Sequence, residues 1–173
     1  NGSVYSVNNR VNSYSGRAHM DGMVFRGYVP QDGVTGGWGG EEFNFSWFME
    51  GSGTDFAIAS MAKYLRDQEG SESAAWQKYN DEYLYFTARA TNYVHLFNES
   101  MGGWFRAKKS DGTWLQTDEQ FDPTAQGYGY CEDNAYNYAF PPYDGQGLAN
   151  LYGMARDKDG RTALGDKLDE AYS

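Results

Sequence analysis

The stretch AAWQKYNDEYLYFTARATNYVHLF, residues 74–97, carries the strongest helical pattern of the chain. Its aromatic and apolar residues recur every three or four positions, at Trp76, Tyr79, Tyr83, Phe86, Ala90, Tyr93 and Phe97. This period predicts an amphipathic helix of about six turns, or about 33 Å. We expect the stripe to face the core of the domain rather than to bind a cofactor.

Weaker helical patterns lie on both sides of this stretch. Thr54 is a candidate cap for a helix whose apolar positions follow the spacing i, i+3, i+4, i+7, namely Ile58, Met61, Ala62 and Leu65. A short helix is possible over 20–25, and a helix is expected to return at Glu132, break at the prolines 141–142 and resume to about residue 152. A last helix is predicted from Thr162, with Leu164 and Leu168 directed inward.

These patterns predict a single, mainly α-helical domain. Residues 1–53 are rich in Gly, Asn and Ser and indicate a loop-rich entry segment, followed by a helical segment over 54–173. A short hairpin is expected around residues 104–114, where Ser110-Asp111-Gly112 has turn chemistry. Strands and helices do not alternate, which disfavours a Rossmann-type fold.

Composition excludes several classes of partner. The net charge is −10, and Lys108-Lys109 is the one basic pair, so neither nucleic acid nor an anionic membrane surface is expected to bind. One cysteine, Cys131, permits no internal disulfide, and the two histidines are too few and too far apart to predict a zinc site. Aromatic residues make up 17% of the chain, which suits sugar binding as well as core packing.

The segment 127–138, GYGYCEDNAYNY, places one carboxylate, Glu132, among four tyrosines. An acid in an aromatic environment can have a raised pKa and remain protonated near neutral pH, as a glycosidase general acid must. A plainer interpretation is that Glu132 caps a helix, and the helix dipole would then stabilise its charged form. Burial or a neighbouring carboxylate such as Asp133 would be needed to raise its pKa.

Six short motifs in chain order resemble the catalytic domain of glycoside hydrolase family 92, the calcium-dependent, inverting, exo-acting α-mannosidases. They lie within residues 16–152 and comprise residues 27–30 (GYVP), 49–59, 89–97 (RATNY and LF), 105–114 (FR and DGTW), 130–138 (YCEDNAYNY) and 142–148 (PYD and GL). Each motif alone is weakly specific, whereas their common order is fairly specific.

The resemblance implies a section of an (α/α)6 toroid-type barrel and removal of terminal mannose from glycans. It assigns the general acid to Glu132 and pocket-shaping or sugar-binding roles to Glu50 and Asp55. Trp38, on a Gly-rich loop, is a candidate sugar platform or a packing staple. Further expected substrate contacts are Tyr130, Tyr136 and Asp144.

The family's general base lies in an Asn-Asp-Asp segment that has no counterpart here, so the base and most calcium ligands are expected outside this chain, on remaining segments of a parent enzyme. Secretion or a periplasmic location is implied in the same way.

The sequence also departs from the family pattern. Asp133, Tyr136 and Tyr143 stand where the family has Gly, Trp and His, which suggests a divergent specificity. Three alternatives stay open: a non-catalytic carbohydrate-binding or structural fragment, another (α/α)-barrel glycosidase such as an α-glucosidase or trehalase relative, and a plain helical interaction domain.

Overall fold

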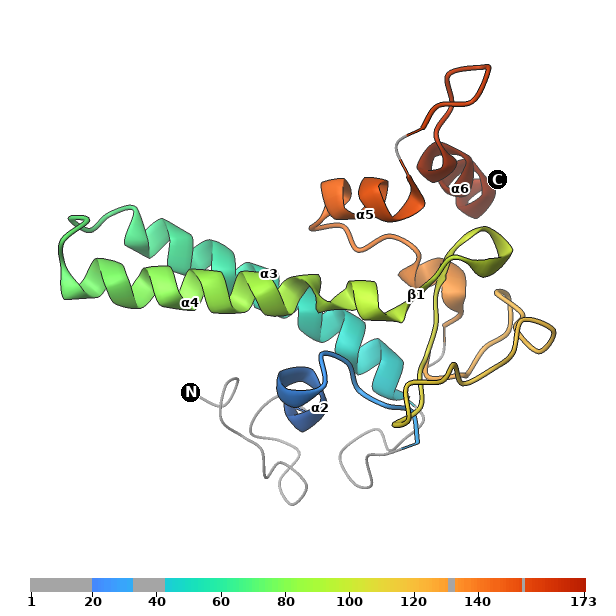
Figure 1. The fold of residues 1–173 in the computed structure, drawn as a ribbon, viewed down its shortest axis with the longest axis horizontal. Coiled ribbons are helices and arrows are strands. Elements are labelled where there is room, and N and C mark those ends of the chain that lie inside the picture. The colour runs from blue at the N-terminus through green and yellow to red at the C-terminus, as the bar shows by residue number, and fades with distance from the viewer. Residues whose placement is uncertain (1–19, 33–42, 131–132, 154) are drawn as a thin grey trace.

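The computed structural model describes residues 20–32, 43–130, 133–153 and 155–173. Its α-helices are α2 (Met20–Phe25), α3 (Asn44–Arg66), α4 (Ala74–Ala90), α5 (Gly145–Tyr152) and α6 (Ala163–Tyr172). Shorter elements are the 3-10 helices η2 (Thr91–Leu96), η3 (Ser100–Gly102) and η4 (Ala135–Tyr138), and the strands β1 (Phe97–Asn98) and β2 (Trp104–Phe105). The described part of the chain is therefore mainly helical, as predicted (Figure 1).

Helices α3 and α4 form a long antiparallel hairpin that extends away from the rest of the molecule (Figure 1). Ser73 caps α4 by accepting a hydrogen bond from the Trp76 amide (3.0 Å). The predicted stripe of α4 is buried only in its C-terminal half, at Phe86 and Ala90. Towards the hairpin tip it is half-buried, and there the Arg66 guanidinium covers the Tyr83 ring at 4.9 Å. The expectation that the whole stripe is core is therefore wrong for its first half.

Helix α3 begins eleven residues earlier than the sequence predicted, with Phe43 rather than Thr54 at its N-cap position. Thr54 does not cap it, because its hydroxyl donates to the carbonyl of Glu50 inside the helix (3.1 Å). The run Gly51-Ser52-Gly53 has low helix propensity, so the sequence did not predict the first half of α3. Packing overrides propensity here, since Gly51 and Ser52 are buried and a Cβ on Gly53 would lie 3.4 Å from the Tyr143 ring. Small residues let the segment carrying Tyr143 approach the helix closely.

A buried ion pair joins the two helices of the hairpin. Asp55 on α3 and Arg89 on α4 are 2% and 6% exposed. The guanidinium donates from Nε to Oδ2 and from Nη2 to Oδ1 of the carboxylate, both at 3.1 Å. Such two-point geometry compensates the cost of removing both charges from water better than a single contact does.

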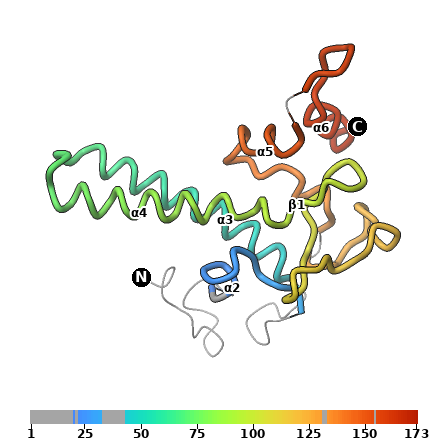
Figure 2. Tube along the Cα trace, in the orientation of Figure 1, coloured from blue at the N-terminus to red at the C-terminus, as the bar shows by residue number. Residues whose placement is uncertain are grey.

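The expected hairpin around residues 104–114 is present in reduced form. A single antiparallel bridge pairs Lys108 with Trp114, and the Lys109 amide donates to the Thr113 carbonyl at 2.8 Å. The residues just before it form β2, which pairs instead with β1 in an antiparallel two-stranded sheet. Figure 2 follows the chain from β1 through irregular segments on the side opposite the hairpin tip.

The C-terminal third is less helical than predicted. The helix expected from Glu132 is, among the described residues, the 3-10 helix η4, which Asn134 caps. Helix α5 is capped by Asp144, and α6 by Thr162 as predicted.

On α6 the inward residue is Lys167 rather than Leu168, which is 38% exposed, while Leu164 packs against the core. The Lys167 ammonium lies 3.0 Å from the centre of the Trp104 ring, an attractive cation–π contact that explains the exchange. Burial lowers the pKa of Lys167, and the neighbouring Glu170 carboxylate opposes that shift.

The described helices also include none with the length and apolar character needed to cross a bilayer.

Replacing Asp55 by Asn should destabilise the protein by about 3–5 kcal/mol, because the Arg89 charge would stay buried without its partner. Urea unfolding would measure the change. Asp67→Asn, at the position just after α3, removes surface ion pairs with Lys63 and Arg66 and should change the unfolding midpoint far less. Equal effects of the two substitutions would contradict the structural role of the buried pair.

Candidate functional site

A cavity of about 550 Å³ lies between the middle of α3 and the segment that joins η4 to α5. It falls in the size range of small-molecule sites, which are concave, mostly apolar and equipped with a few polar groups. Helix α3 provides Met49, Glu50, Gly53, Thr54 and Ala57, and the joining segment provides Asn137, Tyr138, Phe140, Pro141, Pro142 and Tyr143.

Glu50 is the one carboxylate among the described residues that line this cavity. Its side chain is exposed, so the carboxylate is hydrated and ready to accept hydrogen bonds from a ligand. Asn137 and Thr54 add the neutral polar groups of the lining. The rest is aromatic or aliphatic, which suits the apolar face of a sugar ring.

Tyr143 forms part of the wall where α3 and the joining segment meet. Its ring stacks on Phe56 with centroids 5.4 Å apart and an interplanar angle of 29°. The Tyr93 ring meets it edge-on at 5.9 Å. Burial raises the pKa of Tyr143 well above its usual range, so the hydroxyl stays protonated at any physiological pH.

Four of the predicted substrate contacts are not among the residues that line this cavity. Asp55 is held by Arg89 in the buried ion pair. Tyr130 is 1% exposed, and its hydroxyl donates to the Phe105 carbonyl at 2.7 Å. Tyr136 packs against Trp104 and donates to Glu170 at 3.2 Å.

The fourth is Asp144, whose carboxylate caps α5 through the Gly147 amide at 2.9 Å. It also accepts a hydrogen bond from the Tyr93 hydroxyl at 2.8 Å. Helix capping and core contacts therefore occupy side chains that the sequence assigned to sugar binding. Glu50 is the predicted contact that the structure places in the cavity wall.

Trp38, Cys131 and Glu132 lie outside the described residues, but both chain flanks of Glu132 are defined. The Asp133 amide donates to the Tyr130 carbonyl at 3.1 Å, which brings the two flanks together. The Tyr130 ring stacks near Tyr138 with centroids 6.0 Å apart. Because Tyr138 lines the cavity, the chain on either side of Glu132 is anchored beside the cavity wall.

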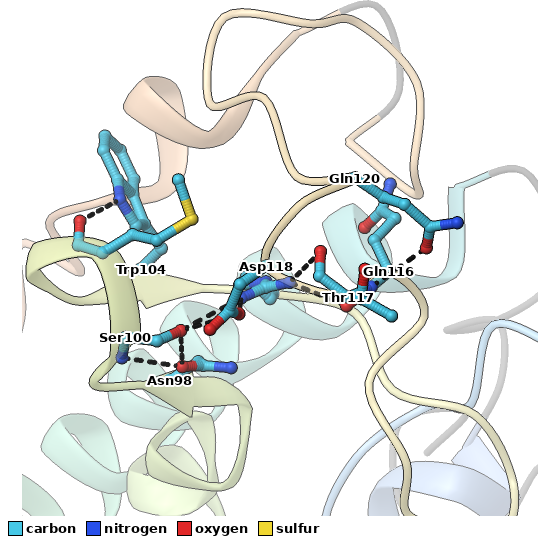
Figure 3. Close-up of polar contacts among 9 residues, drawn as sticks. Asn98, Ser100, Trp104, Gln116, Thr117, Asp118 and Gln120 are labelled. Atoms are coloured by element: carbon cyan, nitrogen blue, oxygen red, sulfur yellow. Dashed lines mark hydrogen bonds and ion pairs between the residues drawn. The ribbon is translucent and has the colours of Figure 1, made fainter.

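A polar network is centred on Arg106, which follows β2, and the sequence analysis did not predict it. Arg106 is 1% exposed and donates to the Asp118 carboxylate and the Gln116 carbonyl, both at 2.7 Å. Figure 3 shows Ser100 between Asn98 and Asp118, in hydrogen-bond contact with both. The network ties residues 98–100 to residues 116–118.

The calcium expected from the resemblance needs several hard oxygen ligands. Across residues 20–32, 43–130, 133–153 and 155–173, no three His, Cys, Asp or Glu side chains converge closely enough to hold a metal ion. The described residues thus offer no cluster of three carboxylates for a calcium ion.

The sequence matches the model of the glycosyl hydrolase family 92 catalytic domain over residues 3–173. The chain belongs to this family. The resemblance drawn from the motifs is thereby confirmed, and it identifies a glycoside hydrolase domain whose substrates are glycans. A search of curated proteins gave no significant match.

In this family 92 chain, Gly129 should be far less replaceable than a glycine of similar conformation elsewhere. Its φ is +91°, and a Cβ there would lie 2.8 Å from the Phe45 Cβ and 2.4 Å from the Gln31 side chain. Gly129→Ala should destabilise by about 2–4 kcal/mol, from backbone strain plus overpacking.

Gly112 is the matched control, with φ +86° and no atom within 4 Å of its added Cβ. Gly112→Ala should cost about 1–2 kcal/mol, from strain alone. Denaturant unfolding of both variants would test the difference, and equal costs would contradict the close packing of Gly129 on α3.

Proposed function

We propose that this family 92 chain contributes the general-acid side of an inverting α-mannosidase that removes terminal mannose from glycans. The observation that carries the proposal is the cavity beside α3, which combines one carboxylate with an aromatic wall. The flanks of Glu132 are anchored next to it through Tyr130 and Asp133. Family membership supports the reaction class, and the motif resemblance supports mannose as the sugar.

In the proposed reaction, Glu132 gives its proton to the glycosidic oxygen as the bond from that oxygen to the anomeric carbon breaks. A water molecule attacks the anomeric carbon from the opposite face and gives its proton to a second carboxylate. An inverting enzyme needs the two carboxyl groups roughly 6.5–9.5 Å apart to accommodate this water. We assign the second carboxylate to a segment outside these residues.

Glu50 is proposed to accept hydrogen bonds from hydroxyl groups of the sugar. The rings of Tyr138, Phe140 and Tyr143 would contact its apolar face. Trp38 is retained as a candidate sugar platform. Calcium bound by residues outside the described set and a secreted or periplasmic location are part of the same proposal.

A non-catalytic glycan-binding role is the second candidate, favoured by the single carboxylate among the described lining residues. Product analysis separates the candidates. Release of mannose from α-mannosides supports the first proposal, release of glucose would indicate an α-glucosidase, and sugar binding without hydrolysis by the complete protein would favour the second.

Glu132→Gln in the catalytically active protein should lower kcat on glycans by about 10²–10⁴-fold, because the leaving oxygen is no longer protonated. The loss of kcat should be much smaller on dinitrophenyl α-mannoside, because its leaving group departs without a proton. Steady-state kinetics on both substrates would measure this. Glu69→Gln, at the exposed tip of the α3–α4 hairpin, is the control. Unchanged turnover in Glu132→Gln would refute the assignment.

Glu50→Gln should raise KM for α-mannosides about tenfold, since hydrogen bonds to a charged acceptor are stronger than those to an amide. Because the Glu50 side chain is exposed, the Glu50→Gln variant should have the same unfolding midpoint as the unmodified protein. The same kinetic assay and thermal unfolding would check both expectations. An unchanged KM would remove Glu50 from the binding site.

A further inference from the structure

Contacts with two other elements restrain the Tyr143 ring in the cavity wall. The ring stacks on Phe56 of α3 with centroids 5.4 Å apart. Tyr93 of η2 meets it edge-on at 5.9 Å. On the α3 side, a Cβ added to Gly53 would lie 3.4 Å from the ring, so little room separates the ring from the helix. These contacts restrain the ring, and the backbone that follows it is restrained separately.

The chain after Tyr143 is anchored by the Asp144 carboxylate. One oxygen, Oδ1, accepts a hydrogen bond from the Gly147 amide at 2.9 Å and caps α5. The other, Oδ2, accepts from the Tyr93 hydroxyl at 2.8 Å. The carboxylate therefore joins its own helix to η2, which lies 51 positions earlier in the sequence.

The Tyr93 hydroxyl is held in place for this contact. Tyr93 is 0% exposed, and its ring also lies edge-on to Phe105 at 5.6 Å. Burial and the Asp144 carboxylate raise the pKa of Tyr93 above its usual range, so the hydroxyl remains a donor at physiological pH. A hydrogen bond to a charged acceptor is stronger than one between neutral groups. Packing is also tight, since a Cβ on Gly147 would lie 2.5 Å from the Tyr93 hydroxyl oxygen.

We infer that Tyr93 is a positioning residue for the sugar-binding wall: its hydroxyl holds the Asp144 carboxylate and so fixes the backbone next to Tyr143, whose ring would contact the apolar face of the sugar. Tyr93 is fully buried and does not line the cavity, so it acts through Asp144 and does not touch the sugar. The inference rests on the proposed function, in which the cavity holds the mannose ring, and adds a residue that controls how tightly the ring is bound.

Loosening a binding wall has a kinetic signature that general destabilisation lacks. An interaction made equally in the ground state and the transition state affects KM and leaves kcat unchanged. Because Tyr143 would pack against the sugar in both states, displacing it should raise KM alone. Partial unfolding would instead reduce the amount of active enzyme, which lowers the apparent kcat and leaves KM unchanged.

Tyr93→Phe removes the hydroxyl and keeps the ring that meets Tyr143. In the catalytically active protein it should raise KM for methylumbelliferyl α-mannoside about three- to tenfold, with kcat nearly unchanged. Tyr152→Phe is the matched control, because it removes a hydroxyl that donates to the Gly103 carbonyl at 3.3 Å, and Tyr152 does not line the cavity. The control should change neither constant. Equal rises of KM in both variants, or a loss of kcat at constant KM in Tyr93→Phe, would overturn the inference.

A double-mutant cycle tests whether the hydroxyl acts through Asp144. Asp144→Asn keeps an oxygen that can cap α5 but removes the charge that the hydroxyl meets, so it should raise KM about two- to fivefold. The double variant should raise KM by clearly less than the product of the two single effects, because both substitutions weaken one contact. An effect equal to that product would overturn the inference. If Tyr93→Phe does not fold, an unchanged KM in Asp144→Asn would do the same.

Ala57→Trp is measured alongside to separate the two proposals. Ala57 lines the cavity from α3, and a tryptophan there would occupy space that the sugar needs. If this variant raises KM and the Tyr93 and Asp144 variants do not, the positioning inference alone fails. If it leaves KM unchanged, the cavity does not hold the sugar, and the proposed function and the inference fail together.

Discussion

The capping of α3 by the Gly129 carbonyl is the interaction on which the site depends. A helix of 23 residues without a side-chain cap begins where a loop from the other half of the sequence supplies an acceptor. Ser46 donates both of its hydrogen bonds to that carbonyl. Four residues after Ser46 the same helix carries Glu50 of the cavity wall, and five residues after Glu50 it carries Asp55 of the buried ion pair. This contact therefore links the helix that carries part of the cavity wall to the irregular segment over residues 127–130.

Elsewhere in the fold, two buried arginines join neighbouring segments of the chain. Arg89 and Arg106 are both almost fully buried, and each is met by a carboxylate. The energetic gain of such pairs over apolar residues is small, because desolvation consumes most of the attraction. Their consequence is specificity of packing: one fixes α3 against α4, and the other fixes residues 98–100 against 116–118.

The sequence predicted the elements that depend on local chemistry and missed those that depend on contacts across the chain. The α-helix over residues 74–90, the short helix at 20–25 and the helix capped by Thr162 follow from spacing and capping residues. The predicted continuation of the first of these to residue 97 was wrong, because a 3-10 helix occupies 91–96 and Phe97 begins β1. The first half of α3 did not, because Gly51-Ser52-Gly53 reads locally as a loop and only packing makes it helical.

The same division holds for the site. Glu50 was predicted from a motif, whereas Ser46 carried no signal: it falls in the segment assigned to loops, and its partner Gly129 is identified only by the three-dimensional structure. Tyr130 and Asp144 show the converse. A motif identifies residues that a family retains, yet in this structure these two side chains hold the scaffold together, since one anchors to Phe105 and the other caps α5.

Tyr143 is where the chain's divergence from the family pattern has the clearest physical consequence. The resemblance has a histidine at this position, and a histidine would change charge between pH 5 and 8. The tyrosine hydroxyl stays neutral across that range because burial raises its pKa. With a histidine, this part of the cavity wall could carry a positive charge. With Tyr143 it is neutral and aromatic, and the ring stacks on Phe56. The described lining residues include no positively charged side chain beside Glu50. This environment favours neutral sugar hydroxyls over anionic substituents as partners of Glu50.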